Sequence, residues 1–194
     1  MGKLDFYDRP FKRTRPQDDL IHFETKFGTN VTVGFGVVID ENCRIGSNVF
    51  IGHNTVIRSG VKIGNESIIG HLVVIESDTV IGERVTIQSQ CHITKFARID
   101  DRVFFGPMAM CINTKNISHG RGFKPKLQGP RIKYGARIGS GCILLPGSEV
   151  GVNSVVGAGA LVNGIIPDGK IYYCKEMVAK AQGTVTRREM LKNE

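Results

Sequence analysis

The chain has 194 residues and a formal net charge of +8, and 41% of its residues are hydrophobic, so it is long enough for one domain with a substantial core and is not disordered. No basic stripe alternates with aromatic residues and no zinc-finger or helix-turn-helix spacing occurs, so nucleic acid is not an expected partner. The sequence also lacks a signal-peptide pattern and any run approaching the ~20 apolar residues of a membrane span, which predicts a cytoplasmic protein. Its five cysteines include no CxxC pair, so we expect free thiols rather than a disulfide framework.

Residues 1–20 contain two prolines and nearly balanced charges, and we expect an irregular arm there. A six-residue repeat begins at Ile21 and places an aliphatic or Phe anchor at every sixth position as far as Phe105. After an interruption it continues from Ile132 to Val162. This spacing fits a short strand plus a turn, repeated around a coil.

A second, mostly small residue stands two positions before each anchor, so both face the same side of a strand and form the core. Glycine often follows the anchor. Asn, Asp or Gly is frequent three residues after it, and these residues tolerate positive φ, which marks a corner in every repeat. Three corners give a triangular coil of 18 residues. We therefore predict an all-β domain, a parallel β-helix spanning residues 21–167.

The repeated [LIV]-G-x-x-x-x pattern resembles that of the hexapeptide-repeat acyltransferases. The resemblance implies that the β-helix is left-handed. We expect residues 168–194 to form a C-terminal cap with a short helix, because Thr186 and Glu189 form a capping-box pattern.

The residues just before the anchors sort by 18 into two apolar faces and one charged face. An apolar surface of this extent predicts an oligomer packed along the corner that the two apolar faces share, and the family forms homotrimers. The alternative is that the chain's own termini cover that corner.

The repeat is interrupted by 15 inserted residues, which place a loop at about residues 112–130. The loop has no acidic residue and carries four cations that suit phosphate oxygens, although a merely solvated basic loop is the alternative: Lys115, Arg121, Lys124 and Lys126. Its single histidine, His119, is our candidate general base, because acyl transfer needs the nucleophile's proton removed.

The sequence around the loop is similar to the active-site half of those hexapeptide-repeat enzymes that N-acetylate nucleotide-linked amino sugars. The matching elements are Gly106-Pro107, Asn113 and His119. The resemblance implies that Asn113 orients the acceptor or donates to the developing oxyanion.

The resemblance also implies that acetyl-CoA is the acyl donor and lies between subunits, beside the late coils. The residues that match its contacts are Gly139, Ser140 and Ala158. The end of the coenzyme site departs from the family pattern: Asn163-Gly164 stands where relatives have Thr-Lys, and Tyr172-Tyr173-Cys174-Lys175 replaces a Gly-x-Pro-Ala element. Asn163 is still the residue at the matching coenzyme position.

His53 and His71 are 18 residues apart and should stack on the corner between the apolar faces, with His92 on the adjoining face. Zinc-dependent carbonic anhydrases share this repeat, but the H-x4-H pair that they use is missing, so we expect no metal. The leading hypothesis is therefore an acetyl-CoA-dependent N-acetyltransferase acting on an amino sugar, which is nucleotide-linked by the resemblance. The alternatives are O-acetylation of a sugar or other small acceptor, and a noncatalytic scaffold.

Overall fold

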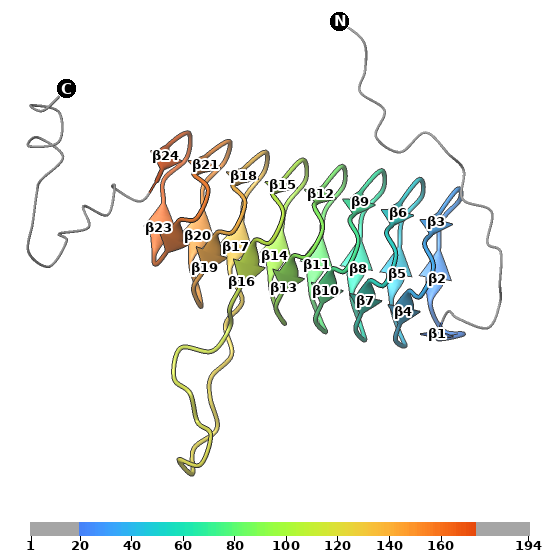
Figure 1. Cartoon of the computed structure of the whole chain (residues 1–194), viewed down its shortest axis with the longest axis horizontal. Coiled ribbons are helices and arrows are strands. Elements are labelled where there is room, and N and C mark those ends of the chain that lie inside the picture. Colours follow the sequence, from blue (N-terminus) through green and yellow to red (C-terminus); the bar gives the residue numbers. More distant parts are fainter. Residues whose placement is uncertain (1–19, 174–194) are drawn as a thin grey trace, which may run out of the picture.

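The computed structural model describes residues 20–173, which wind into a parallel β-helix of stacked triangular coils (Figure 1). Twenty-four two-residue strands form three parallel sheets of eight strands each, called sheets A, B and C. The chain visits them in the repeating order A, B, C, so its corners are the A–B, B–C and C–A corners.

Every strand is two residues long. Sheet A contains β1 (Leu20–Ile21), β4 (Val38–Ile39), β7 (Val56–Ile57), β10 (Val74–Ile75), β13 (His92–Ile93), β16 (Met110–Cys111), β19 (Ile143–Leu144) and β22 (Leu161–Val162). Sheet B contains β2 (Lys26–Phe27), β5 (Arg44–Ile45), β8 (Lys62–Ile63), β11 (Val80–Ile81), β14 (Arg98–Ile99), β17 (Arg131–Ile132), β20 (Glu149–Val150) and β23 (Ile165–Ile166). Sheet C contains β3 (Thr32–Val33), β6 (Phe50–Ile51), β9 (Ile68–Ile69), β12 (Thr86–Ile87), β15 (Phe104–Phe105), β18 (Arg137–Ile138), β21 (Val155–Val156) and β24 (Ile171–Tyr172).

The strand register confirms the 18-residue coil and the position of the insertion. Neighbouring strands before the loop pair residues 18 apart, as in Val56↔Val74. Across the loop, Arg98 pairs with Arg131, so the insert leaves the coil without shifting its register. The coil also continues past residue 167, because β24 joins sheet C beside β21.

The core is the stack of anchors and small residues that the repeat predicts. Ile51, Ile69 and Ile87, for example, are fully buried. Buried hydroxyls at the small positions donate to carbonyl groups of the next coil, as Thr55 Oγ1 does to Gly70 O at 2.8 Å. The interior is therefore apolar, and most of its few polar side chains bond to the main chain.

The corners have positive φ three residues after the anchor, as the sequence predicts. The structure extends this rule to residues that the pattern of Asn, Asp and Gly does not mark, including Leu72 (φ 57°), Phe96 (φ 66°) and Arg102 (φ 57°). The stacking of the coils on either side imposes this backbone conformation on these residues, which adopt it only at a cost in free energy.

The three outward faces also match the prediction. Val56, Val74, His92, Met110 and Ile143 follow one another on sheet A. Arg137 departs from this pattern, because it lies beside Phe104 on the otherwise mostly apolar sheet C.

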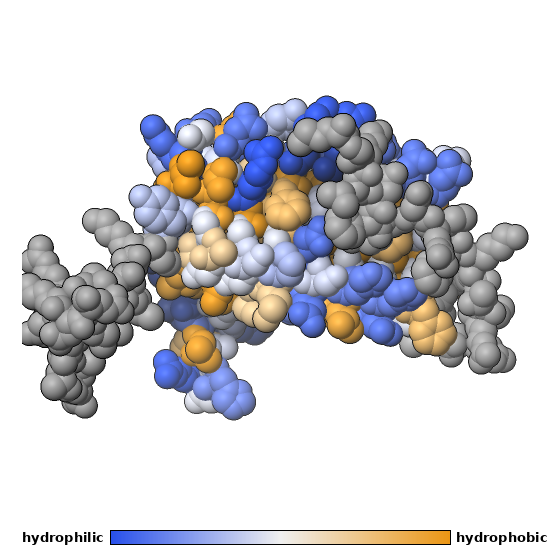
Figure 2. Space-filling view, turned by 45° about the horizontal axis from the view of Figure 1, so that its top comes forward, coloured by the Kyte–Doolittle hydropathy of each residue, from blue (hydrophilic) through white to orange (hydrophobic). Residues whose placement is uncertain are grey.

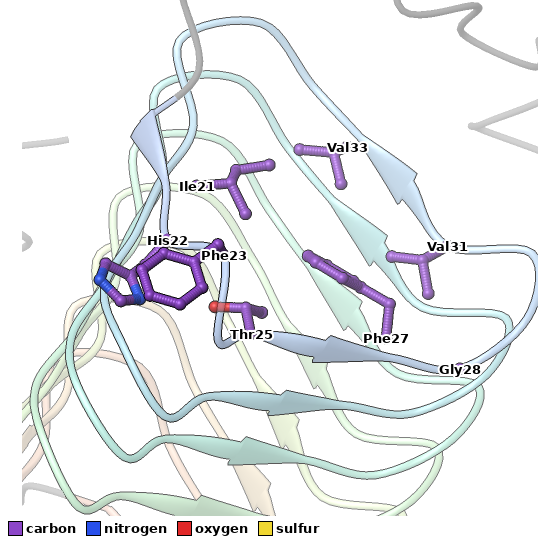
Figure 3. A pocket seen from close by; sticks show the side chains of 8 residues that line it. All are labelled: Ile21, His22, Phe23, Thr25, Phe27, Gly28, Val31 and Val33. Carbon is purple, nitrogen blue, oxygen red and sulfur yellow. The ribbon is translucent and has the colours of Figure 1, made fainter.

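The N-terminal end of the described coil holds a hollow with both polar and apolar walls (Figure 3). Its lining consists of Ile21, His22, Phe23, Thr25, Phe27, Gly28, Val31 and Val33. The expected arm and the expected C-terminal helix, with Thr186 and Glu189, lie outside the described residues. Among residues 20–173 there is no helix long and apolar enough to cross a membrane.

Candidate active site at the inserted loop

The loop leaves sheet A after β16 and enters sheet B at β17, so it projects from the A–B corner (Figures 1 and 2). Its two arms meet in an antiparallel bridge between Thr114 and Leu127, and Gln128 N–H donates to Asn113 O at 2.8 Å. The insert is therefore a hairpin with a fixed root and an outlying tip.

The tip carries the predicted functional side chains. His119 lies in the turn and is exposed, and so are the four predicted phosphate ligands, Lys115, Arg121, Lys124 and Lys126. Among residues 20–173 no carboxylate pairs with any of these cations. Their charge is therefore available to an anionic ligand or to another protein surface.

Asn113 lies at the root of the hairpin and is 9% exposed. Its Nδ2 donates to Lys95 O at 3.3 Å, and its Oδ1 accepts from Thr114 Oγ1 at 3.0 Å. The side chain thus ties the root to the preceding coil. The structure does not bring Asn113 and His119 together within one chain, because they occupy opposite ends of the hairpin.

A second polar cluster lies beside this root, and the sequence did not reveal it. His92 projects from β13, and its Nε2 lies 3.3 Å from Glu76 Oε1. Glu76 Oε2 accepts from Thr94 Oγ1 at 3.1 Å and from Lys95 N–H at 2.9 Å. Glu76 and Thr94 are 18 residues apart and hence stacked, which is the signal that could have pointed to the cluster.

The pKa of Glu76 lies below its usual value. Partial burial works in the opposite direction and raises it, but the donors from Lys95, Thr94 and His92 together prevail. Glu76 is therefore a carboxylate held in place on both of its oxygens.

His53 and His71 stack on the C–A corner, as the sequence predicts, with ring centroids 5.1 Å apart and planes 10° apart. Each Nδ1 accepts a main-chain N–H from the preceding coil, Phe35 N to His53 at 2.7 Å and His53 N to His71 at 2.8 Å. Ser89 Oγ accepts from His71 N at 3.2 Å and continues this ladder. Burial, with a smaller contribution from His53, lowers the pKa of His71.

This ladder of hydrogen bonds, from a main-chain N–H to the side chain one coil further along, does not continue into the late coils, where the predicted coenzyme residues lie. Pro107 follows Ser89 on the corner and Ala158 follows Ser140, and neither side chain offers an acceptor. Within residues 20–173, the N–H groups of Ser89 and Ser140 consequently have no hydrogen-bond partner. Ser140 and Ala158 are exposed, and the space around Gly141 and Gly159 is open, so a slender amide-bearing chain can approach this edge.

The predicted site residues therefore divide between two edges of sheet A. Asn113, Asn163 and the loop lie on the A–B corner, while Gly139, Ser140 and Ala158 lie on the C–A corner. The latter corner is also the one to which the sequence assigned the oligomer axis. Coenzyme cannot bind to a stretch of the C–A corner that is tightly packed against other protomers.

The described cysteines do not supply a nucleophile. Cys43, Cys91, Cys111 and Cys142 are buried, and none of them forms a disulfide bond within residues 20–173. Burial raises the pKa of the Cys91 thiol to about 11 and raises the pKa of Cys111 as well. Within residues 20–173 no group of three His, Cys, Asp or Glu side chains is arranged to hold a metal ion.

The fold and its hexapeptide repeat define the class of the protein, a left-handed parallel β-helix. A family model described as the GMPPB C-terminal domain matches residues 18–117, just over half of the chain, and the chain belongs to this family. A search of curated protein sequences found no match.

The fold is similar to those of several solved structures. One is an acetyltransferase structure from Bacillus cereus, described as putative in its name, with 23% identity, 80% of each chain covered and a TM-score of 0.41. AntD, an N-acyltransferase from Bacillus cereus solved with dTDP and coenzyme A, has 19% identity, coverage of 87% of this chain and 88% of that one, and a TM-score of 0.47. The UDP-N-acetylglucosamine acyltransferase of Francisella novicida has 19% identity and a TM-score of 0.39. The match covers 81% of this chain but only 65% of the Francisella enzyme.

Proposed function

We propose that the protein is an acetyl-CoA-dependent N-acetyltransferase that acts on an amino sugar linked to a nucleotide. The observation that carries the proposal is the basic hairpin with His119 at its tip, which is the single long insertion in the described coil. Long insertions in repeat folds are preferred places for functional residues. The four cations of the hairpin suit the phosphates of a nucleotide.

The acyl donor fits the late C–A corner. The exposed small side chains of Ser140 and Ala158 leave the main chain accessible, and the N–H of Ser140 suits an amide carbonyl of the pantetheine arm. Gly139 allows the close stacking of this edge, because a Cβ there would lie 2.5 Å from Ala158 N. Asn163 lies on the other corner of sheet A, where it contacts coenzyme from a neighbouring protomer.

The protein acts as a homotrimer in which the C–A corner of one protomer runs along sheet A of the next, beneath its hairpin. This arrangement places coenzyme on one side of a shared cleft, and His119 and Asn113 on the other. It leaves the late C–A corner at the cleft instead of burying it at the axis. His119 accepts the acceptor's proton, and Asn113 either orients the acceptor from the root of the same hairpin or, from a second protomer, donates to the oxyanion.

The test is release of free thiol from acetyl-CoA with a panel of amino and hydroxy sugars, free and nucleotide-linked. Nucleotide-linked amino sugars are expected to give the highest kcat/KM. His119→Ala is expected to lower kcat/KM about a hundredfold to ten-thousandfold, as removal of a general base does. His22→Ala, far from the hairpin on the first coil, serves as the control.

The panel also separates N-transfer from O-transfer. A neutral amine attacks a thioester without activation, whereas a hydroxyl must be activated. The loss of activity in His119→Ala is therefore expected to be smaller if the protein is an N-acetyltransferase than if it is an O-acetyltransferase. If no acceptor in the panel gives thiol release, and calorimetry detects no binding of coenzyme A, the results would favour a noncatalytic scaffold.

A further inference from the structure

We infer that His92, oriented by Glu76, is a second catalytic base of the proposed acyl-transfer site. This inference rests on the proposed function and deepens it, because it assigns a proton-transfer role to a cluster in the body of the β-helix. The hairpin supplies one imidazole, and the coil beneath its root supplies another.

The hydrogen bonds of the cluster fix which nitrogen of His92 is basic. An ionised carboxylate only accepts hydrogen bonds, so the contact between His92 Nε2 and Glu76 Oε1 places the ring proton on Nε2. The lone pair of Nδ1 is then free to accept a proton from a substrate. A carboxylate that holds a histidine in one tautomer is the arrangement used by enzymes that activate a nucleophile through imidazole.

Glu76 is itself held rigidly, which a chance surface ion pair is not. Thr94 Oγ1 and Lys95 N–H both donate to Oε2, so the carboxylate cannot rotate away without losing two hydrogen bonds. Lys95 O in turn accepts from Asn113 Nδ2 at the root of the hairpin. The cluster and the root of the loop are therefore one connected network.

The surroundings of His92 suit a base that meets a partner molecule. Its side chain is 40% exposed, and its in-register neighbours on sheet A are the uncharged Val74 and Met110. Among the described residues, Glu76 is the charged group that contacts the ring. In the proposed trimer this face lines the shared cleft.

The chemistry of an amine acceptor requires two proton acceptors. An amino sugar enters as an ammonium ion and must lose one proton before its nitrogen can attack the thioester carbon. The C–N bond then forms, the C–S bond breaks, and a second proton leaves the nitrogen, so the products are the amide, the free thiol of coenzyme A and one released proton. His92 takes the first proton where the ammonium ion passes the root of the hairpin, and His119 takes the second at the thioester and delivers it to the departing sulfur.

The test is the pH dependence of kcat/KM for thiol release with a nucleotide-linked amino sugar. His92→Asn is expected to lose about a hundredfold near pH 7. The loss should shrink steadily as the pH rises, because solvent then supplies the neutral amine. Glu76→Gln should give a smaller loss of the same pH-dependent form, which marks Glu76 as a positioning residue. His22→Gln, which alters the separate His22–Glu24 pair at 3.9 Å, should match the wild type at every pH.

A loss in His92→Asn that is equal at all pH values would show a purely structural role and would overturn the inference, as would wild-type kinetics. Either result leaves the transferase proposal standing if His119→Ala remains impaired. A wild-type protein that releases no thiol with any acceptor would overturn both. Histidine ¹⁵N NMR adds a readout without substrate: the proton should reside on Nε2 of His92, and residence on Nδ1 would contradict the inference.

Discussion

At the scale of single residues, several corners of the coil carry residue types that do not favour the positive φ required there. Arg102 adopts φ 57° on the B–C corner, whereas Asn153 at φ 53° is a residue that tolerates this conformation. The left-handed conformation costs an ordinary side chain about 1–2 kcal/mol. The free-energy cost of positive φ therefore differs from corner to corner, and substitutions at several corners should stabilise the coil.

Arg102→Asn is expected to raise the free energy of unfolding by about 0.5–1 kcal/mol, because asparagine adopts positive φ more readily than arginine. Asn153→Arg, the reverse change at an equivalent corner, should lower it by a similar amount. Urea denaturation measures both. A loss of stability in Arg102→Asn would show that the arginine side chain makes a contribution larger than the strain.

His71 couples stability to pH. Burial lowers its pKa from the ordinary value of 6.5, so the folded chain binds this proton less readily than the unfolded chain does. The contribution of the neutral ring is present above about pH 6.5 and is lost as the pH falls below that value. Melting temperatures measured from pH 8 to pH 5 should fall less steeply in His71→Asn than in the wild type.

Asparagine is the matched replacement because Asn65 Oδ1 already accepts the Ser47 N–H at 2.8 Å in the same way on another corner. His71→Ala instead removes the acceptor of His53 N–H and should cost about 1 kcal/mol at pH 8. An acid response in His71→Asn as steep as in the wild type would assign the effect to other groups.

Residue positions that obey the repeat could be predicted from the sequence, and those set by side-chain contacts could not. The stacked His53 and His71 follow directly from their spacing of 18. The contact between His92 and Glu76 does not, because the two are 16 residues apart and meet diagonally between neighbouring coils. The rotamers of both side chains decide that contact, and periodicity carries no information about rotamers.

At the scale of elements, the hairpin is an insertion that the coil does not need. Ile112 and Gln128 flank a segment of 15 residues, 113–127, and the hydrogen bond from Gln128 N–H to Asn113 O closes the base of this segment. The strand that follows the loop, β17, pairs with β14 of the preceding coil in the ordinary register. The coil should therefore close without the segment.

Excision of residues 113–127 is expected to restore the six-residue spacing and to leave the melting temperature within a few degrees of the wild type, because the cost of closing a loop rises only slowly with its length. Thiol release should disappear. Calorimetric melting and the thiol assay measure the two effects. Failure of the excised chain to fold would show that the hairpin stabilises the coil.

Element positions were predictable before and after the loop because each strand repeats the same local rule. The rule weakens at the C-terminal end, where β23 follows β22 after a shortened corner and β24 then rejoins sheet C. Sequence periodicity ended at Val162, so the last strands lay beyond its reach. The tip of the loop has no repeat at all, and the position of His119 relative to Asn113 depended on the hairpin geometry.

At the scale of the whole molecule, the apolar outer faces of sheets A and C predict self-association. Sedimentation equilibrium at micromolar concentration should give a mass about three times the 21.3 kDa of one chain. Met110→Glu, on the exposed outer face of sheet A, should shift the mass toward the monomer. A monomeric wild type would contradict the trimer and, with it, the shared cleft.

Subunit mixing tests most directly whether the hairpin of one protomer completes the acyl-transfer site of the next. The two parents are His119→Ala and Ser140→Phe, and the second should fold because Phe35 occupies the same corner position. Each parent alone should be almost inactive. Co-refolding of an equal mixture should restore about a quarter of the wild-type sites, the fraction in which both partners are intact in a closed ring. A mixture no more active than its parents would contradict the shared site.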